Sequence, residues 1–435
     1  MTLAGPLIVN NLSIAGIHFA DAVMAGRLGA ETLAAVAVGG SIWFFGFTMA
    51  LGILMAISPI AARHYGAGNP ELIGRYTRQG IYFGIIIAVA LILLFHFFVG
   101  SALDAIGIDP EFRGLTEGYV HAIMWGAPGI FIFLALRFTT EGIGVTKPIM
   151  YASVSSLGIN VFLNWVFMFG KLGAPALGAV GCGIASAATM WLIMFGLSVY
   201  MWCSRKYEPL KIFARVGKIR PETIKEILWL GVPIAVMITA EAGLFNAVSV
   251  LMGTRGANIA AAHQVAINFA MTMFMVPLAL SSAITVRVGH ALGSGNPEAA
   301  RFSGAIGIAT CAVFMTCSAT MMLLFRDTVV LIYTNDPAVS SIAVSLLLAA
   351  AIFQIGDGVQ IGAAGVLRGY KDTRFPMVIN LFAYWVLAFP LAYMAAVTYK
   401  AAPVYTWGAF IVGLSVAAVL LSWRFVRISR AELAA

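Results

Sequence analysis

Long apolar stretches separated by short polar segments run along the whole chain. A stretch of about 20 apolar residues is long enough to cross the hydrocarbon core of a bilayer as a helix. The run from Ile81 to Gly100 contains no charged residue and is typical of the set. The pattern predicts an all-α polytopic membrane protein with twelve spans, at about 3–25, 36–62, 79–100, 119–136, 148–170, 177–202, 228–252, 259–286, 303–325, 341–366, 376–397 and 403–423.

The composition excludes an aqueous surface over most of the chain. Of its 435 residues, 61% are hydrophobic and only 10% are charged, and the mean hydropathy is +0.94. Soluble domains carry about 25% charged residues. The chain therefore has the lipid bilayer as its main partner.

The net charge of +8 follows membrane topology and does not indicate nucleic acid. With twelve spans, 20 of the 26 basic residues fall on one side of the membrane. The six on the other side are Arg27, Arg113, Lys171, Arg255, Arg326 and Lys400. Since basic loops stay in the cytoplasm, both termini are expected on the cytoplasmic side of a cell inner membrane.

The chain repeats itself at a constant spacing. The segment Gly66–Glu71 (GAGNPE) returns 227 positions later as Gly293–Glu298 (GSGNPE), and the same spacing relates Pro6 to Pro233. Each half then has six helices. Because six is an even number, the halves are expected to share one orientation, related by a pseudo-two-fold axis along the membrane normal.

The longest polar connection marks the boundary between the two halves. It spans residues 203–227 and carries seven basic residues. We therefore expect an N-terminal six-helix lobe over 1–202, a cytoplasmic linker over 203–227 and a C-terminal six-helix lobe over 228–435.

Three acidic residues lie inside predicted spans, namely Asp21, Glu241 and Asp357. A charged side chain at the bilayer centre costs roughly 2.5–3.5 kcal/mol. Every Lys and Arg is predicted in a loop or at a helix end, so no basic side chain is expected near these carboxylates. Facing a cavity, they would bind protons, a metal cation or a cationic substrate. The alternative is a protonated carboxyl group that hydrogen-bonds between helices.

Polar amides accompany the acids at helical spacing. Asn160 and Asn164 are four residues apart, share one helix face and lie in the same half as Asp21. Gln264 and Asn268 form a second such pair. Hydrogen bonding between helices explains buried amides more often than ligand binding does.

Several segments together carry a family resemblance. They are Asp21–Gly26 (DAVMAG), Ala262–Asn268 (AHQVAIN), Arg287–His290 (RVGH) and Leu367–Asp372 (LRGYKD). With them the chain resembles the multidrug and toxic compound extrusion (MATE) family, NorM branch, over nearly its full length. The resemblance implies a secondary transporter and not an enzyme. Such proteins export organic cations, including cationic drugs, dyes and fluoroquinolone-like compounds, in exchange for inward Na⁺ or H⁺. It further implies alternating access by a monomer that needs no cofactor besides the coupling ion.

The resemblance also assigns roles by position. Glu241 and Asp357 correspond to a cation site in the C-terminal lobe, where they would be the ligands of a bound Na⁺ ion. Asp21 with Asn160 and Asn164 corresponds to an N-terminal substrate or proton site.

Three further positions follow from the same resemblance. Gln264 and the outer-loop Asp336 correspond to positions that hold substrate in some relatives. Where several relatives have tyrosine four residues before the tenth-span aspartate, this sequence has Phe353. The phenyl ring removes a hydroxyl near the Na⁺ site, which weakens the case for Na⁺ over H⁺.

Two other functions compete with this one. A flippase for lipid-linked precursors, from the same superfamily, would line its cavity with Lys and Arg to bind phosphates, whereas these spans are acidic. An intramembrane enzyme would place paired carboxylates near the surface, where Asp104, Asp109 and Glu111 cluster in an outer loop; a solvated loop explains that cluster more simply. A channel fits less well, because a deep site in each half suits alternating access.

Overall fold

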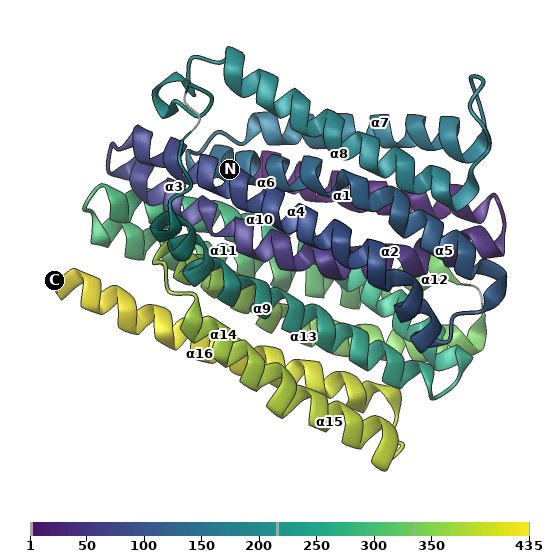
Figure 1. Ribbon diagram of the computed structural model, residues 1–435. Coiled ribbons are helices and arrows are strands. Elements are labelled where there is room, and N and C mark those ends of the chain that lie inside the picture. Colours follow the sequence, from purple (N-terminus) through teal and green to yellow (C-terminus); the bar gives the residue numbers. More distant parts are fainter. Residues whose placement is uncertain (1–2, 215–216, 335, 435) are drawn as a thin grey trace. The chain divides into compact units, whose positions relative to one another are not determined.

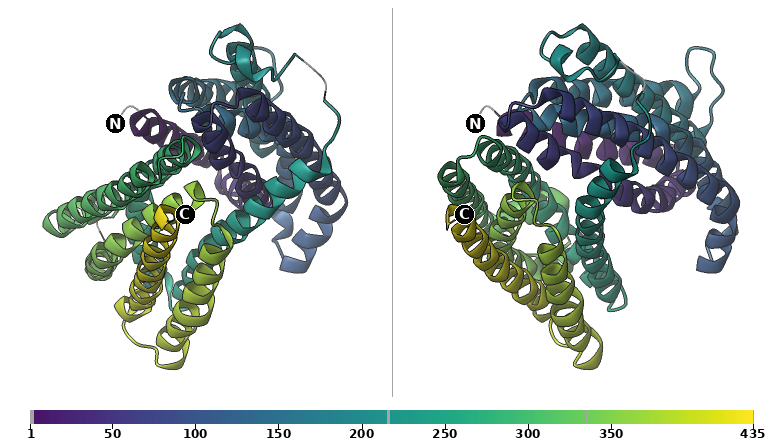
Figure 2. Two further views of the ribbon diagram at one scale, coloured as in Figure 1. Left: turned by 90° about the vertical axis from the view of Figure 1, so that its left-hand side faces the viewer. Right: turned by 60° about the vertical axis from the view of Figure 1, so that its left-hand side comes forward.

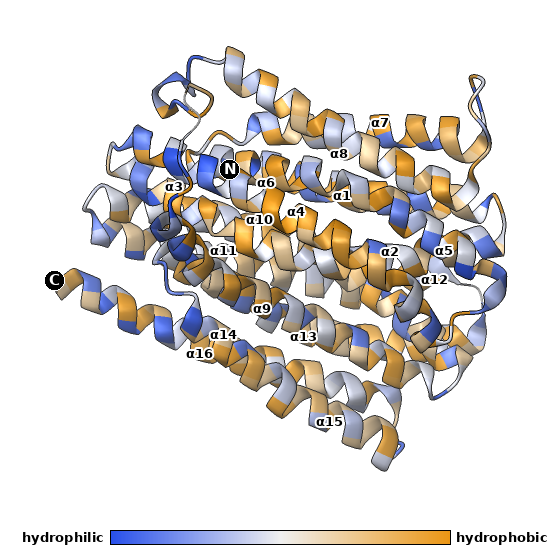
Figure 3. Ribbon diagram, in the orientation of Figure 1, coloured by the Kyte–Doolittle hydropathy of each residue, from blue (hydrophilic) through white to orange (hydrophobic). Residues whose placement is uncertain are grey.

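A computed structural model describes residues 3–214, 217–334 and 336–434 (Figure 1). Arg215, one of the seven basic residues of the predicted linker, lies outside the described residues. The chain folds into helices, and twelve of those described are long and apolar enough to cross a membrane. Apolar residues fill the middle of these helices and polar residues gather at their ends (Figure 3). The prediction of twelve spans is confirmed.

The chain divides into two compact units, Met1–Ala235 and Val236–Ala435, which we call the first and second units. The first unit contains six spans together with the linker and the beginning of the seventh span. Its helices are α1 (Ala4–Gly26), α2 (Ala30–Met55), α3 (Ile57–Gly66), α4 (Pro70–Ile106), α5 (Pro110–Ile123), η1 (Met124–Gly126), α6 (Ala127–Gly142), α7 (Lys147–Phe169), α8 (Gly178–Cys203) and η2 (Glu208–Leu210). Of these, α2 with α3 and α5 with α6 each make one span.

The second unit contains most of α9 and all later helices. They are α9 (Pro221–Gly253), α10 (Ala257–Gly293), α11 (Pro297–Leu324), α12 (Arg326–Tyr333), α13 (Pro337–Gly369), α14 (Arg374–Leu381), η3 (Phe382–Ala388), α15 (Phe389–Tyr393), η4 (Met394–Thr398) and α16 (Pro403–Ala434). The eleventh span combines α14, η3, α15 and η4, and both η3 and η4 are π-helical. The core of this unit forms where α13 packs against α10, α11 and α16.

The repeated motif has the same backbone geometry in both units. Gly68 and Gly295 adopt φ of 69° and 73°, a left-handed conformation that glycine tolerates best. The next residues, Asn69 and Asn296, each donate a backbone N–H to a carbonyl of the preceding helix at 2.9 Å. A proline then begins α4 and α11, where its missing N–H costs nothing. The sequence repeat therefore corresponds to a structural repeat at this turn.

The linker packs on the beginning of α4 and runs across it in Figure 2. Gln79 of α4 is 2% exposed and holds the linker through both ends of its amide. It donates to the Lys218 carbonyl at 2.9 Å and accepts from the Arg220 N–H at 2.8 Å. Lys211 also pairs with Glu71 at 2.5 Å. The linker is thus part of the first unit.

The beginning of α9 is fixed to the first unit as well. Glu226 accepts a hydrogen bond from the Tyr76 hydroxyl of α4. Gly52 of α2 and Gly231 of α9 leave no space for a Cβ atom, because the backbone of the other helix lies against each of them. The division between the two units therefore falls within α9, after Ala235.

Replacing Gln79 by alanine is expected to release the linker. Each hydrogen bond contributes about 0.5–1.5 kcal/mol, so losing both raises the open population about tenfold. Tryptic cleavage after Lys218, which tracks that population, should accelerate by the same factor. Gln264→Ala, at an exposed amide of the second unit, is the control. Equal cleavage of both variants would show that Gln79 does not hold the linker.

Candidate functional site

The first unit contains a buried polar cluster built around Asp21 of α1. Asp21 is 8% exposed, and its Oδ1 accepts a hydrogen bond from the Asn164 side chain of α7 at 2.6 Å. The same Asn164 amide donates to Asn160 Oδ1 at 3.1 Å, and Asn160 donates to the Ser186 hydroxyl of α8 at 3.4 Å. The Cys182 thiol of α8 also lies within interaction range of Asp21.

The cluster forms because of helical spacing and helix packing. Asn160 and Asn164 are one turn apart on α7, so they present their amides on one face. That face packs against α1 at the level of Asp21. The structure thus brings together the aspartate and both asparagines that the sequence pointed to. Asn164 Oδ1 has no hydrogen-bond partner, which leaves an acceptor for a cation or a proton donor beside the carboxylate.

The second unit holds the other two intramembrane acids close together. Glu241 of α9 is half-buried, and Asp357 of α13 is 4% exposed. Each carboxylate lies within electrostatic range of the other, and Asp357 Oδ1 has no hydrogen-bond partner. Two like charges at such a place repel each other unless a positive charge joins them.

One such positive charge belongs to the protein. Arg368 of α13 is 3% exposed, donates to the Ser281 hydroxyl at 2.5 Å and lies within electrostatic range of Glu241. The prediction that no basic side chain approaches the carboxylates is therefore wrong for Glu241. The reason is that α13 continues to Gly369, so Arg368 remains helical and its long side chain stays in the protein. Arg137, predicted in an inner loop, likewise lies inside α6.

Tyr384 and Asn380 belong to the same unit and are not among the residues predicted from the sequence. Both are 0% exposed, and neither the Tyr384 hydroxyl nor the Asn380 amide has a hydrogen-bond partner. Tyr384 lies within electrostatic range of both Glu241 and Asp357. Their spacing of four residues in the eleventh span was the only signal in the sequence.

Phe353 lies one turn before Asp357 on α13 and is 3% exposed. Its ring packs among Phe245, Trp407 and Phe410, with centroids 5.6–6.5 Å away. The position that could have offered a hydroxyl therefore belongs to an aromatic cluster.

The two predicted substrate positions lie outside both buried clusters. Gln264 is exposed and donates to Asn268 at 3.2 Å, so the predicted pair exists. Asp336 is exposed and caps α13 by accepting the Ala338 N–H at 2.8 Å. Capping gives Asp336 a structural role. A contact of either residue with substrate remains a prediction.

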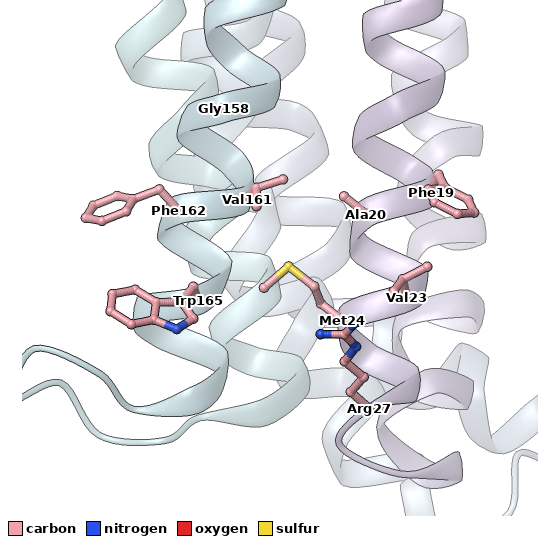
Figure 4. A pocket seen from close by; sticks show the side chains of 9 residues that line it. All are labelled: Phe19, Ala20, Val23, Met24, Arg27, Gly158, Val161, Phe162 and Trp165. Carbon is pink, nitrogen blue, oxygen red and sulfur yellow. The ribbon is translucent and has the colours of Figure 1, made fainter.

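A separate groove of about 620 Å³ lies between α1 and α7 (Figure 4). Its walls are apolar except for one cation; they consist of Phe19, Ala20, Val23, Met24, Arg27, Gly158, Val161, Phe162 and Trp165. Met24 and Val161 point into the space between the two helices, whereas Phe162 and Trp165 project away from it. No carboxylate lines the groove, so it lacks the group that would hold an organic cation.

The donor set limits the kind of metal ion that either cluster can hold. Within the described parts of the chain, no three His, Cys, Asp or Glu side chains gather as metal ligands. Transition metals prefer such ligands. A hard monovalent cation, by contrast, can use carboxylate oxygens together with neutral oxygens. The residues around Glu241 and Asp357 fit that second donor set.

Fold and site together define a polytopic membrane transporter, since twelve spans enclose buried acids in both units. Comparison with known sequences identifies the family. The chain matches the MatE family over residues 6–166 and 233–394, and it belongs to that family. It is 36% identical to the multidrug resistance protein NorM of Aliivibrio fischeri, covering 98% of this chain and 94% of that protein. It is also 36% identical to the multidrug resistance protein PmpM of Pseudomonas aeruginosa, covering 99% and 91%.

Solved structures show the same fold. The eukaryotic MATE transporter AtDTX14 matches with a TM-score of 0.89 at 24% identity, covering 99% of this chain and 96% of that one. A MOP superfamily transporter from Pyrococcus furiosus, described as having a binding pocket of reverse polarity, matches with a TM-score of 0.88 at 20% identity, covering 99% and 95%. The chain is thus a multidrug efflux transporter of the MATE family, a secondary transporter and not an enzyme.

Proposed function

We propose that this transporter exports organic cations in exchange for inward Na⁺ or H⁺, and that Glu241 and Asp357 bind the coupling ion. The charge balance of the second unit carries the proposal. Two carboxylates and one arginine leave one negative charge without a partner within the buried cluster. Burying an unpaired charge is costly, so the cluster should take up one monovalent cation or one proton.

Coupling then follows from the linkage between ion binding and conformation. An ion shifts a conformational equilibrium only by its difference in affinity for the two states. Suppose that Glu241, Asp357 and Arg368 lie close together in one state and separate in the other. The cluster then needs a bound cation to balance its net negative charge in the first state only. Uptake of the ion from outside would then favour the state that releases drug.

Asp21 is the second element of the proposal. It lies in the other unit, hydrogen-bonded to Asn164, with no Lys or Arg among the side chains that act on it. We assign it to drug or proton binding, with Asn160 and Asn164 holding its carboxyl group in place. Gln264 and Asp336 are proposed as substrate contacts on the exposed surface. We further propose that the protein acts as a monomer in the inner membrane. Both termini should lie in the cytoplasm, as the distribution of basic residues indicates.

Drug efflux from proteoliposomes tests the coupling directly. Purified protein is reconstituted with ethidium inside, and a Na⁺ gradient or a pH gradient is imposed separately. At least one gradient should drive ethidium out, and collapse of that gradient should stop it. An ethidium efflux rate that depends on neither gradient would contradict antiport.

The sign of the substrate charge separates this proposal from a flippase. For the Pyrococcus furiosus transporter, the reverse polarity of the binding pocket is described as suggesting a different function. Here the two buried clusters carry three carboxylates and one arginine, and a low-dielectric surrounding strengthens that field.

Cationic dyes should therefore be exported at least about tenfold faster than anionic dyes of similar size. The reason is that the interaction energy of one unit charge with such a field exceeds about 1.4 kcal/mol. Efflux of ethidium and of a sulfonated dye from the same liposomes provides the measurement. Comparable rates for the two dyes would favour a flippase or a non-selective pore.

A further inference from the structure

Part of the second unit's buried surface consists of polar groups that have no partner. The Asn380 amide nitrogen and oxygen and the Tyr384 hydroxyl are buried without any hydrogen bond. Leaving such a group unsatisfied costs about 1–3 kcal/mol, so each needs an explanation. A ligand that enters the cluster when the transporter works would provide one.

Helix packing places the segment around Tyr384 next to Glu241. The Trp385 indole N–H donates to the carbonyl of Ala240 at 3.2 Å, and the Trp385 ring packs against Gly243. Ala240 and Gly243 flank Glu241 on α9. The helix segment η3 therefore meets α9 at the level of Glu241, and Tyr384, the residue before Trp385, acts electrostatically on both Glu241 and Asp357.

The backbone at this point is also unusual. Residues Phe382–Ala388 form a π-helix within an otherwise α-helical span. A π-helix has a wider turn, which changes the direction of the side chains relative to an α-helix, and such segments frequently occur at functional sites.

The acidic pair needs further oxygen atoms to hold a cation. Two carboxylates are the only acidic groups in this cluster, and no third metal-binding side chain joins them within the described residues. Phe353, on the helix of Asp357, has no oxygen to offer. Tyr384 has an unpaired oxygen and lies within electrostatic range of both acids.

We propose that the Tyr384 hydroxyl is an oxygen ligand of a coupling Na⁺ that Glu241 and Asp357 bind. The inference rests on the proposed function, because it adds a residue to the same ion site. The hydroxyl oxygen would contribute a lone pair while its proton is donated to one carboxylate. Tyr384 then sets the affinity for Na⁺ without touching the drug.

Tyr384→Phe tests the proposal, since it removes one oxygen atom that bonds to nothing within the protein. The half-saturating Na⁺ concentration for ethidium efflux should rise about tenfold, as expected for one lost ligand of a charged group. Saturating Na⁺ should restore efflux by the variant, because the substitution lowers only the affinity for the ion. Direct ²²Na⁺ binding to the purified variant should weaken by the same factor.

Tyr370→Phe is the matched control. Tyr370 is also buried with an unpaired hydroxyl in the second unit, but the groups that act on it are Arg301 and Glu432. Its variant should bind Na⁺ like the wild type.

The outcomes separate this inference from the proposed function. If Asp357→Asn stops Na⁺-driven efflux and Tyr384→Phe leaves the half-saturating Na⁺ concentration unchanged, Tyr384 is not a ligand although the acidic site stands. If Asp357→Asn transports normally, the ion site itself is wrong. Failure of Tyr384→Phe to insert would reveal a structural role for the hydroxyl and overturn the inference, as would a wild type driven by H⁺ alone.

Discussion

Glu241→Gln and Asp357→Asn should each abolish ion-driven drug efflux while the protein still inserts into the membrane. Either substitution removes one of two negative charges, so the remaining carboxylate and Arg368 sum to zero net charge. A neutral cluster has no reason to take up a cation. Since a bond to a charged group contributes about 1.5–3 kcal/mol, loss of one carboxylate should lower the ion affinity by at least about tenfold.

The rate of ethidium efflux under the driving gradient is the measurement, with ²²Na⁺ binding as a second readout. Glu298→Gln and Asp327→Asn are matched controls, because both acids are exposed in the second unit. Both controls should transport like the wild type. Wild-type efflux by Glu241→Gln or Asp357→Asn would show that the pair does not bind the coupling ion.

The number of spans could be predicted from the sequence because bilayer thickness fixes the length of an apolar stretch. The residues at which the helices begin and end could not be predicted in the same way. The third predicted span covers 79–100, whereas α4 extends from Pro70 to Ile106. Its first turns contain polar residues such as Glu71, which pairs with Lys211 of the linker, and hydropathy does not count them.

The cluster around Asp21 was predictable for a local reason. A lone acid in an apolar span is conspicuous, and amides one turn apart share a face whatever the rest of the fold does. Which helices come together could not be read from the pattern. The repeat and the family resemblance supplied that information for Glu241 and Asp357.

Tyr384 and Arg368 escaped prediction because their positions depend on tertiary structure. Tyrosine in a span is ordinarily assigned to the membrane interface. A π-helix also breaks the 3.6-residue periodicity from which the direction of side chains is inferred. Arginine near a helix end is ordinarily assigned to the loop. Only the packing of η3 on α9 and the continuation of α13 to Gly369 place these residues near Glu241.

Asp21→Asn is expected to slow drug efflux at least about tenfold and to leave ²²Na⁺ binding largely intact. Asparagine keeps the shape of the side chain and an oxygen that can accept from Asn164, so the cluster should persist. It removes the one charge in the cluster that attracts an organic cation or exchanges a proton. A charged hydrogen bond contributes about 1.5–3 kcal/mol, which corresponds to a loss of about tenfold or more.

Asp109→Asn in the same unit is the control for this substitution. Asp109 is exposed and caps α5, and asparagine caps a helix equally well. The control should therefore transport and bind Na⁺ like the wild type. The decisive comparison is between Asp21→Asn and Asp357→Asn in ²²Na⁺ binding. If both variants lose Na⁺ binding equally, Asp21 contributes to the binding of the ion. The division into an ion site in the second unit and a drug or proton site in the first is then wrong. If only Asp357→Asn loses Na⁺ while Asp21→Asn loses drug efflux, the two units bind different partners, and transport requires that each unit respond to occupancy of the other.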